Sequence, residues 1–243
     1  MPPPPASRKR TTPAAQAKSL PAGHKAANKP PAPKPAYHHG DLARALVDSA
    51  TVLIEQGGPS ALTLREAARL AGVSVAAPYR HFADREALLA AVLAKGFDGL
   101  AEHTERARLA APDALAALRA VGVAYVDFAA AHPSVYRLMF GPECDKPSYP
   151  ALMAAGDRAL AVLVQSVREA QAAGRIRAGP PEPVALAGWS ICHGLASLHV
   201  DGLLAGSLPM PVHDAAEQLV DMLLAGMITN RPATRAATRR PRG

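Results

Sequence analysis

The sequence has few of the features that mark a secreted or membrane-spanning protein. Only two cysteines occur in 243 residues, Cys144 and Cys192, and neither belongs to a CxxC pair. We therefore expect no disulfide framework and a reducing, cytoplasmic location. No apolar segment of the secretory type occurs near the amino terminus. The most membrane-like stretch, residues 184–200, is shorter than the ~20 apolar residues of a span, and we interpret it as a buried helix.

Strand patterns are also missing. We find no sustained alternation of β-branched residues and no Asn-Gly hairpin turn, whereas apolar residues recur at helical spacing along most of the chain. A hydrophobic content of 49% is enough to bury a core. The sequence therefore predicts an all-α protein of about nine helices.

Catalytic and metal-binding motifs are absent from the sequence as well. It contains no Gly-rich phosphate loop, no HExxH motif and no pair of catalytic carboxylates. Cys192 adjoins His193, but neighbouring helical residues point about 100° apart and form no obvious nucleophile and base. The histidines His193, His199 and His213 lack the spacing of a known metal site. We expect neither an enzyme nor a bound cofactor or metal.

Acidic residues are missing from both ends of the chain. Residues 1–36 hold seven Lys or Arg and residues 231–243 hold five Arg, so residues 37–230 keep 15 basic against all 20 acidic residues, a net charge of −5. Both tails are rich in Pro and Ala without apolar periodicity, and we expect them to be disordered. They are either solvated without a partner or add salt-sensitive, sequence-independent affinity for nucleic acid.

Two helices are predicted close to the start of the apolar part. From Asp41 to Gly57, apolar residues recur at helical spacing and the segment ends in a pair of glycines. Thr63 and Glu66 have the three-residue spacing of a capping box, in which each side chain satisfies a backbone N–H of the other. A second helix is therefore expected to begin at Leu64.

The second helix is followed by signals for two more. It is expected to stop at Gly72, and Ser74 is expected to cap a third helix only two residues later. Pro78 lies at the fourth position of that helix, so we predict an irregular first turn. Asp84 is expected to cap a fourth helix. Two short helices around a tight glycine turn predict a helix-turn-helix, although any helical bundle could contain such a turn.

These motifs resemble those of TetR-type transcriptional regulators. The match lies in "TLREAARLAGVSVAAPYRHFADREALLAAVLAKGF", residues 63–97, with the preceding helix and its "YHHGDL" lead-in. Further on, Trp189, His193 and Gly194, together with "YRLMF", resemble the carboxy-terminal domain of a TetR subfamily named for a Trp-His-Gly pattern. The resemblance covers about residues 37–230. It implies a sequence-specific DNA-binding regulator, typically a homodimeric repressor released from a palindromic operator by a small-molecule effector.

The resemblance also implies a mode of regulation and a division of the chain. We expect an unidentified small molecule as effector and no membrane partner. Mechanistically, the effector would tilt the helix from about Asp98 to Leu109 and change the distance between two recognition helices, whose half-sites lie ~34–36 Å apart. The expected parts are a disordered basic tail (1–36), a helix-turn-helix DNA-binding domain (37–96), a helical effector-binding and dimerisation domain (97–230) and a disordered Arg-rich tail (231–243).

The expected DNA contacts lie around the amino end of the third helix. Its small apolar side chains could touch thymine methyl groups, and Arg80 is its only long donor, so DNA shape should supply part of the specificity. The family pattern implies phosphate contacts at Thr63, Tyr79, His81 and Arg85, which suits their chemistry, although Tyr79 could also be a core aromatic. The candidates are Thr63, Ser74, Val75, Ala76, Ala77, Pro78, Tyr79, Arg80, His81 and Arg85.

The resemblance places an effector pocket among the helices between residues 97 and 205. The candidate lining residues are mostly aromatic with a few polar tips, and each could instead be ordinary core. The last helix is apolar on more than one face, which favours a dimer interface over a monomeric core helix. The pocket candidates are Tyr125, Phe128, Tyr136, Met139, Phe140, Trp189 and His193; the interface candidates are Leu219, Met222, Leu223 and Met227.

One alternative function remains open from the sequence. Residues 37–96 carry six basic and six acidic side chains, so this domain alone attracts DNA only weakly. Dimerisation and the basic tail would have to add affinity. The alternative is a sequence-independent, chromatin-like DNA binder driven by the tails.

Overall fold

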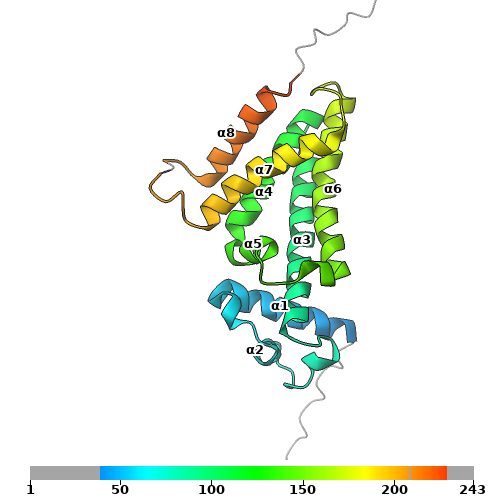
Figure 1. Ribbon diagram of the computed structural model, residues 1–243, viewed down its shortest axis with the longest axis vertical. Helices are drawn as coiled ribbons and strands as arrows, with labels where there is room; N and C mark the ends of the chain where they lie inside the picture. The colour runs from blue at the N-terminus through cyan, green and yellow to red at the C-terminus, as the bar shows by residue number, and fades with distance from the viewer. Residues whose placement is uncertain (1–38, 208, 229–243) are drawn as a thin grey trace, which may run out of the picture. The chain divides into compact units, whose positions relative to one another are not determined.

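The computed structural model describes residues 39–207 and 209–228, and these form a helical fold with one isolated β-bridge, between Ile176 and Ile228. The all-α class is confirmed, with eight α-helices in the described residues where about nine were expected. Three short 3-10 helices lie between them, at Pro59–Ala61, Pro78–Arg80 and Lys146–Ser148. The α-helices are α1 (His39–Gly57), α2 (Leu64–Leu70), α3 (Arg85–Ala110), α4 (Ala114–Ala131), α5 (Pro133–Phe140), α6 (Pro150–Ala172), α7 (Pro181–Val200) and α8 (Val212–Ala225) (Figure 1).

The two tails expected to be disordered, residues 1–36 and 231–243, lie outside the described residues, and so do the first two residues of the "YHHGDL" lead-in. The division at residues 96 and 97 falls inside α3, which continues without a break from Arg85 to Ala110. The helix expected to tilt, Asp98 to Leu109, is thus the second half of α3. The two-domain division itself stays a prediction.

The helix starts follow the local sequence. The Thr63 hydroxyl oxygen accepts a hydrogen bond from the Glu66 backbone N–H at 3.0 Å, which confirms the start of α2 at Leu64. The Glu66 carboxylate accepts a bond from the Arg69 guanidinium at 2.7 Å. At the start of α3, the Asp84 carboxylate accepts from the backbone N–H of Ala87 at 2.8 Å. Both caps satisfy backbone donors that a helix start leaves without partners.

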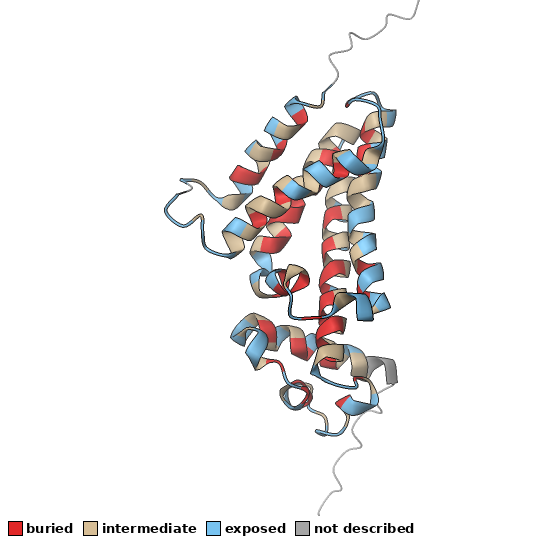
Figure 2. Ribbon diagram, in the orientation of Figure 1, coloured by how far each residue is buried: buried red, intermediate tan, exposed pale blue. Residues whose placement is uncertain are grey.

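Buried residues gather where α1, α2 and the start of α3 meet (Figure 2). Leu46 and Ile54 of α1 and Leu88 and Leu89 of α3 are fully buried. Ala67 of α2 is also fully buried, and its small side chain permits the close approach of α1 and α2. This small core supports the segment between α2 and α3, which carries most of the candidate DNA contacts.

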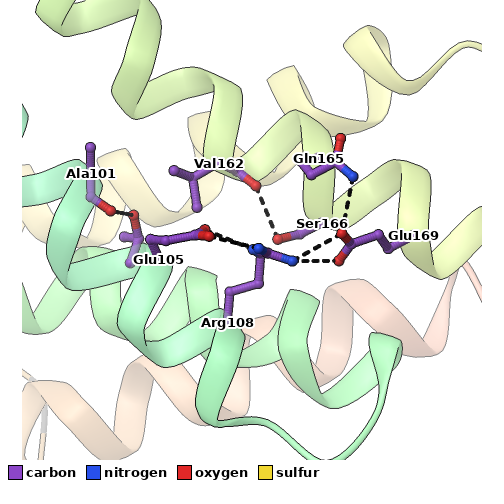
Figure 3. A network of polar contacts seen from close by, with 8 residues as sticks. Ala101, Glu105, Arg108, Val162, Gln165, Ser166 and Glu169 are labelled. Atoms are coloured by element: carbon purple, nitrogen blue, oxygen red, sulfur yellow. Dashed lines mark hydrogen bonds and ion pairs between the residues drawn. The ribbon is translucent and has the colours of Figure 1, made fainter.

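The second half of α3 packs along α6, and two ion pairs set their register. Asp98 of α3 pairs with Arg158 of α6 at 2.6 Å. Arg108 pairs with Glu169 at 2.8 Å (Figure 3). Because both residue numbers increase together, the two helices run in the same direction. The Glu105 carboxylate also accepts a hydrogen bond from the Arg108 guanidinium. The bonds to Glu105 and Glu169 raise the pKa of Arg108 above its usual value, so this side chain stays positively charged.

Helix α4 packs against α3, α6, α7 and α8. Arg119 of α4 pairs with Asp221 of α8 at 2.6 Å, and Asp127 bonds to His213 at 2.9 Å, so α4 and α8 run in opposite directions. Among the described helices, α4 is the one long and apolar enough to cross a membrane. Half of its residues are buried in the fold, and a core helix of a soluble protein has the same composition.

Candidate DNA-binding segment, effector cavity and dimer face

Residues 74–82 form a turn and a 3-10 helix, and the expectation that Ser74 caps an α-helix is wrong. The Ala77 N–H bonds to the Ser74 carbonyl at 3.0 Å, and the His81 N–H bonds to the Pro78 carbonyl at 2.9 Å. Both bonds span three residues rather than four. Pro78 has no N–H and cannot form the α-helical bond to Ser74. The predicted irregularity is present, and it extends beyond the first turn to Arg80.

This segment presents large side chains to solvent. Tyr79 is 61% exposed and Val75 is 53% exposed, while Ser74, Ala76 and Arg80 are also exposed. The alternative of Tyr79 as a core aromatic is therefore wrong. Surface apolar residues that lie together on one short segment suit contact with a partner.

The other candidates of this segment are less accessible. Pro78 is buried, which leaves it little surface for a base contact, and Phe82 is buried as expected for a core residue. Ala77 is half-buried. His81 is half-buried with its ring centroid 6.4 Å from that of Phe82. The exposed part of the segment thus begins at Ser74 and is interrupted by Pro78.

Arg85 has a structural role that the sequence analysis did not find. Its Nε donates to the Leu62 carbonyl at 2.9 Å and its Nη2 donates to the Pro59 carbonyl at 2.7 Å. The guanidinium therefore ties the start of α3 to the loop that precedes Thr63. The partners lie 23 and 26 residues away, so no local spacing reveals them. Arg65, two residues after Thr63, is exposed as well, and it was not among the DNA contacts expected from the sequence.

A cavity of about 380 Å³ lies among α3, α4, α6, α7 and α8. Of the predicted pocket residues, Tyr125, Met139, Phe140 and Trp189 line it. Phe128, Tyr136 and His193 are not among its lining residues, because the helices carrying them turn these side chains elsewhere. The volume lies within the range of small-molecule sites.

The polar tips of the predicted pocket residues bond to one another. The Trp189 Nε1 donates to the Tyr125 hydroxyl at 3.2 Å, which lies 3.1 Å from the Tyr136 hydroxyl. The Tyr136 hydroxyl lies 2.7 Å from Nδ1 of His193, whose Nε2 lies 3.4 Å from the Ser197 hydroxyl. We call these five residues the aromatic network. It joins α4, α5 and α7.

The aromatic network is electrically neutral. Burial raises the pKa of Tyr136 to about 12 and raises that of Tyr125 further, so both phenols keep their protons. Burial also lowers the pKa of His193, which favours the neutral imidazole. More than one arrangement satisfies these groups, because the Tyr125 hydroxyl also lies 2.9 Å from Nδ1 of His193. In one of them each hydroxyl donates to the next member and His193 carries its proton on Nε2. The network therefore locks three helices together.

The predicted interface residues, three on α8 and Met227 just after it, differ in their surroundings. Leu223 and Met227 line the cavity, which places them against their own chain, because α8 packs on α4 and α7. Leu219 is half-buried and is not a lining residue of the cavity, and Met222 is 74% exposed. Met222 has the greatest accessibility for a separate partner.

Helix α7 is less buried than its apolar sequence indicates. Only Ala185, Cys192 and Ala196 are buried along it, whereas Leu186 and Leu198 are exposed. The helix that we interpreted as buried, at residues 184–200, is therefore present but is buried along one side only. Leu186 and Leu198 of α7 and Met222 of α8 are thus large apolar side chains that the described chain leaves exposed.

His193 and His213, two of the histidines considered as metal ligands, have different hydrogen-bond partners. No group of three or more His, Cys, Asp or Glu among residues 39–207 and 209–228 could hold a metal ion. His213 bonds to Asp127, and His193 belongs to the aromatic network. Both cysteines are free and buried.

Two family models match the sequence. The model described as bacterial regulatory proteins, tetR family, matches residues 46–92, and the model described as tetracyclin repressor-like, C-terminal domain, matches residues 118–223. No curated protein matches it. The first match covers the helix-turn-helix segment and the second covers most of α4 through α8.

Solved structures share this fold. A protein with unknown function from Rhodococcus sp. RHA1 is 38% identical, with a TM-score of 0.71 over 81% of this chain and 100% of that chain. The TetR family transcriptional regulator PfmR from Thermus thermophilus is 21% identical, with a TM-score of 0.57 over 74% and 97% of the two chains. A bacterial regulatory protein in the tetR family from Rhodococcus RHA1 is 19% identical, with a TM-score of 0.59 over 78% and 98%. The last two likenesses concern the fold alone.

Proposed function

The chain belongs to the TetR family of bacterial regulatory proteins and is a DNA-binding transcriptional regulator, and from this premise we propose that it is a dimeric repressor released from a palindromic operator by a small molecule. The observation that carries the proposal is the outward exposure of Val75 and Tyr79 on the segment between α2 and α3. The matched families lend no support to a chromatin-like binder.

The proposed DNA contacts divide by chemistry. Val75 and Ala76 offer methyl groups to thymine in the major groove. The hydroxyl of Tyr79 and the guanidinium of Arg80 are exposed donors suited to phosphates, as is Thr63 at the start of α2. Ser74, Ala77 and His81 complete this surface. Pro78 supports the turn from inside.

Arg85 is better described as a positioning residue than as a phosphate contact. Its two bonds to backbone carbonyls hold the loop before Thr63 against the start of α3. The remaining guanidinium nitrogen, Nη1, can still face a phosphate. In either role the side chain couples the position of α2 to that of α3.

We propose that two copies associate through the outward face of α7 and α8. Leu186, Leu198 and Met222 are exposed there, and pairing two such faces would give a symmetric interface. Two recognition segments would then read half-sites ~34–36 Å apart. We also propose that the protein works in the cytoplasm, that it is not an enzyme, and that Trp189 and His193 place it in the Trp-His-Gly subfamily.

Two connections could carry a signal from the cavity to the DNA-binding segment. The first is α3, which carries Arg85 at its start and Thr104, a cavity-lining residue, further along. The second is the loop after α5, where the Asp145 N–H donates to the Glu86 carboxylate at 2.8 Å and the next residue, Lys146, lines the cavity. A ligand that displaces either connection would change the separation of the recognition segments.

The proposal is tested by a charge placed on the recognition segment. Ala76→Glu puts a carboxylate on an exposed position that we place against DNA, so binding of the full-length protein to its own promoter should weaken at least tenfold against scrambled competitor at fixed salt. Ala154→Glu puts the same charge on the exposed side of α6 and should leave binding unchanged. Equal binding by both variants would overturn the docking.

A further inference from the structure

The effector cavity is long in one direction. Its lining follows one side of α6 from Leu152 to Val167, a distance of about 22 Å at 1.5 Å per residue. Met153 and Leu160 belong to this lining and are also exposed, so the cavity opens to solvent along α6 through an apolar edge. The shape favours an elongated ligand over a compact one.

The polar atoms inside the cavity already have partners. The Thr104 hydroxyl donates to the Leu100 carbonyl at 2.9 Å, and Trp189 donates to Tyr125 within the aromatic network. The Tyr125 hydroxyl gives its own proton to that network. Cys192 also lines the cavity, and burial raises the pKa of its thiol to about 11, so it stays neutral. The described residues of the cavity interior thus offer a ligand no unused strong donor and no charge.

Charges occur among the described lining residues only as one cation and one anion. Lys146 lies on the loop after α5 and donates to the Gly141 carbonyl, and Asp157 lies on the exposed side of α6. The two signs cancel. A ligand charge held in the apolar interior, away from Lys146 and Asp157, would lose its hydration without gaining a matched partner, which is strongly unfavourable.

We propose that the cavity takes an uncharged, elongated hydrophobic molecule. This inference deepens the proposed function, because it specifies the chemical class of the small molecule that would release the operator. Affinity comes from apolar contact along α6 and α8. A hydroxyl group at one end can donate to the remaining lone pair of the Tyr125 hydroxyl or to Asp157, and a hydroxyl or carbonyl oxygen can accept from Lys146.

Two fluorescent dyes test the charge preference directly. N-phenyl-1-naphthylamine is uncharged, and 8-anilino-1-naphthalenesulfonate has the same ring system with a sulfonate added. Titrated into the full-length protein, the uncharged dye should bind at least tenfold more tightly. Equal or tighter binding of the sulfonate would overturn the proposal.

Linear competitors test the preference without a change of skeleton. The uncharged 1-decanol should displace N-phenyl-1-naphthylamine at concentrations at least tenfold lower than decanoate or decylammonium, each used below its micelle concentration. Stronger displacement by decanoate would show that Lys146 selects an anion, and stronger displacement by decylammonium would show that Asp157 selects a cation. Either result would overturn the uncharged class.

Two matched variants show whether the dye occupies this cavity. A Cβ added at Gly156 meets no atom within 4 Å, so the ring of Gly156→Phe can enter the cavity, and the loss of a mid-helix glycine favours α6. Dye affinity should fall at least fivefold. Ala154→Phe adds the same ring on the exposed side of α6 and should leave dye affinity unchanged. Equal affinity of both variants and wild type would place the dye elsewhere and overturn the proposal.

The outcomes separate this inference from the proposed function. Selective dye binding that leaves operator affinity unchanged would support the ligand class and contradict the release mechanism. Operator binding that is sensitive to Ala76→Glu, combined with no charge preference among the dyes, would keep the regulator and overturn the ligand class. Thermal unfolding of each variant shows whether a loss of binding reflects a loss of fold.

Discussion

Tyr79 and the pair Tyr125 and Tyr136 place the same side chain in opposite settings. Tyr79 is 61% exposed on the recognition segment, whereas Tyr125 is 8% and Tyr136 is 2% exposed in the aromatic network. The first keeps its hydroxyl available to a partner, and the other two use theirs to hold α4, α5 and α7 together. The role of a tyrosine in this protein therefore follows from the burial of its side chain and not from its residue type.

The largest expected effect comes from removing a buried ring. Tyr136→Ala should lower the free energy of unfolding by about 3–5 kcal/mol, because it leaves a cavity and removes one of the two phenols that hydrogen-bond to His193. Urea unfolding measures the change. Tyr79→Ala is the matched control and should stay within about 0.5 kcal/mol of wild type, since its ring is mostly in solvent. Equal losses in the two variants would erase the distinction between the regions.

A smaller effect is expected from removing only a buried hydroxyl. Tyr125→Phe takes away the acceptor of the Trp189 N–H and should cost about 1–3 kcal/mol of unfolding free energy. Trp189 is the only tryptophan, so its fluorescence reports the same change locally. Tyr149→Phe, at a half-buried tyrosine outside the aromatic network, should cost less. A Tyr125→Phe variant as stable as wild type would show that the network does not hold these helices.

The helix starts and the irregular turn at Pro78 could be predicted from the sequence because they depend on residues close together in the chain. The caps at Thr63 and Asp84 act over three residues, and the irregular turn at Pro78 follows from one missing N–H. The full loss of the third α-helix did not follow, since several weak local preferences compete there. Pairing of Tyr125 with His193, which lie 68 residues apart, depends on the whole packing of α4 against α7.

The direction in which a helix faces was the least predictable feature. Leu223 lies near the end of α8 and Met227 lies two residues beyond it, and by sequence both apolar residues suit an interface or a cavity equally well. Their position in the cavity follows from the docking of α8 on α4, which the ion pair between Arg119 and Asp221 orients. Phe128 lies on α4 and was expected in the pocket, but the rotation of that helix turns it away. Such rotations are set by distant partners.

For the exposed Tyr79 we expect a substitution to weaken DNA binding without lowering the free energy of unfolding. Tyr79→Ala should weaken affinity for the operator about tenfold, which corresponds to ~1.4 kcal/mol, because a phosphate contact and its aromatic surface are lost. Tyr79→Phe should lose only the part that the hydroxyl supplies. Leu109→Ala truncates an equally exposed apolar residue near the end of α3 and is the control. Fluorescence anisotropy at fixed salt measures all three, and unchanged affinity of Tyr79→Ala would remove this residue from the DNA surface.

The smallest expected effect is the pH dependence of stability that two histidines, His213 and His103, contribute. The hydrogen bond and charge of Asp127 raise the pKa of His213, so the pair should stabilise the docking of α8 fully below pH 6.5 and lose this effect as the pH rises through the raised pKa. Because His213 is largely exposed, solvent screening keeps the contribution below about 1 kcal/mol. Thermal unfolding of His213→Gln should differ from wild type at pH 6 and match it at pH 8.

The partly buried His103 should show the opposite pH dependence. Burial and Arg106 lower the pKa of His103, so its protonation destabilises the fold as the pH falls, and His103→Gln should relieve this destabilisation. The same pH dependence in both variants would contradict the assignment of opposite causes to the two histidines.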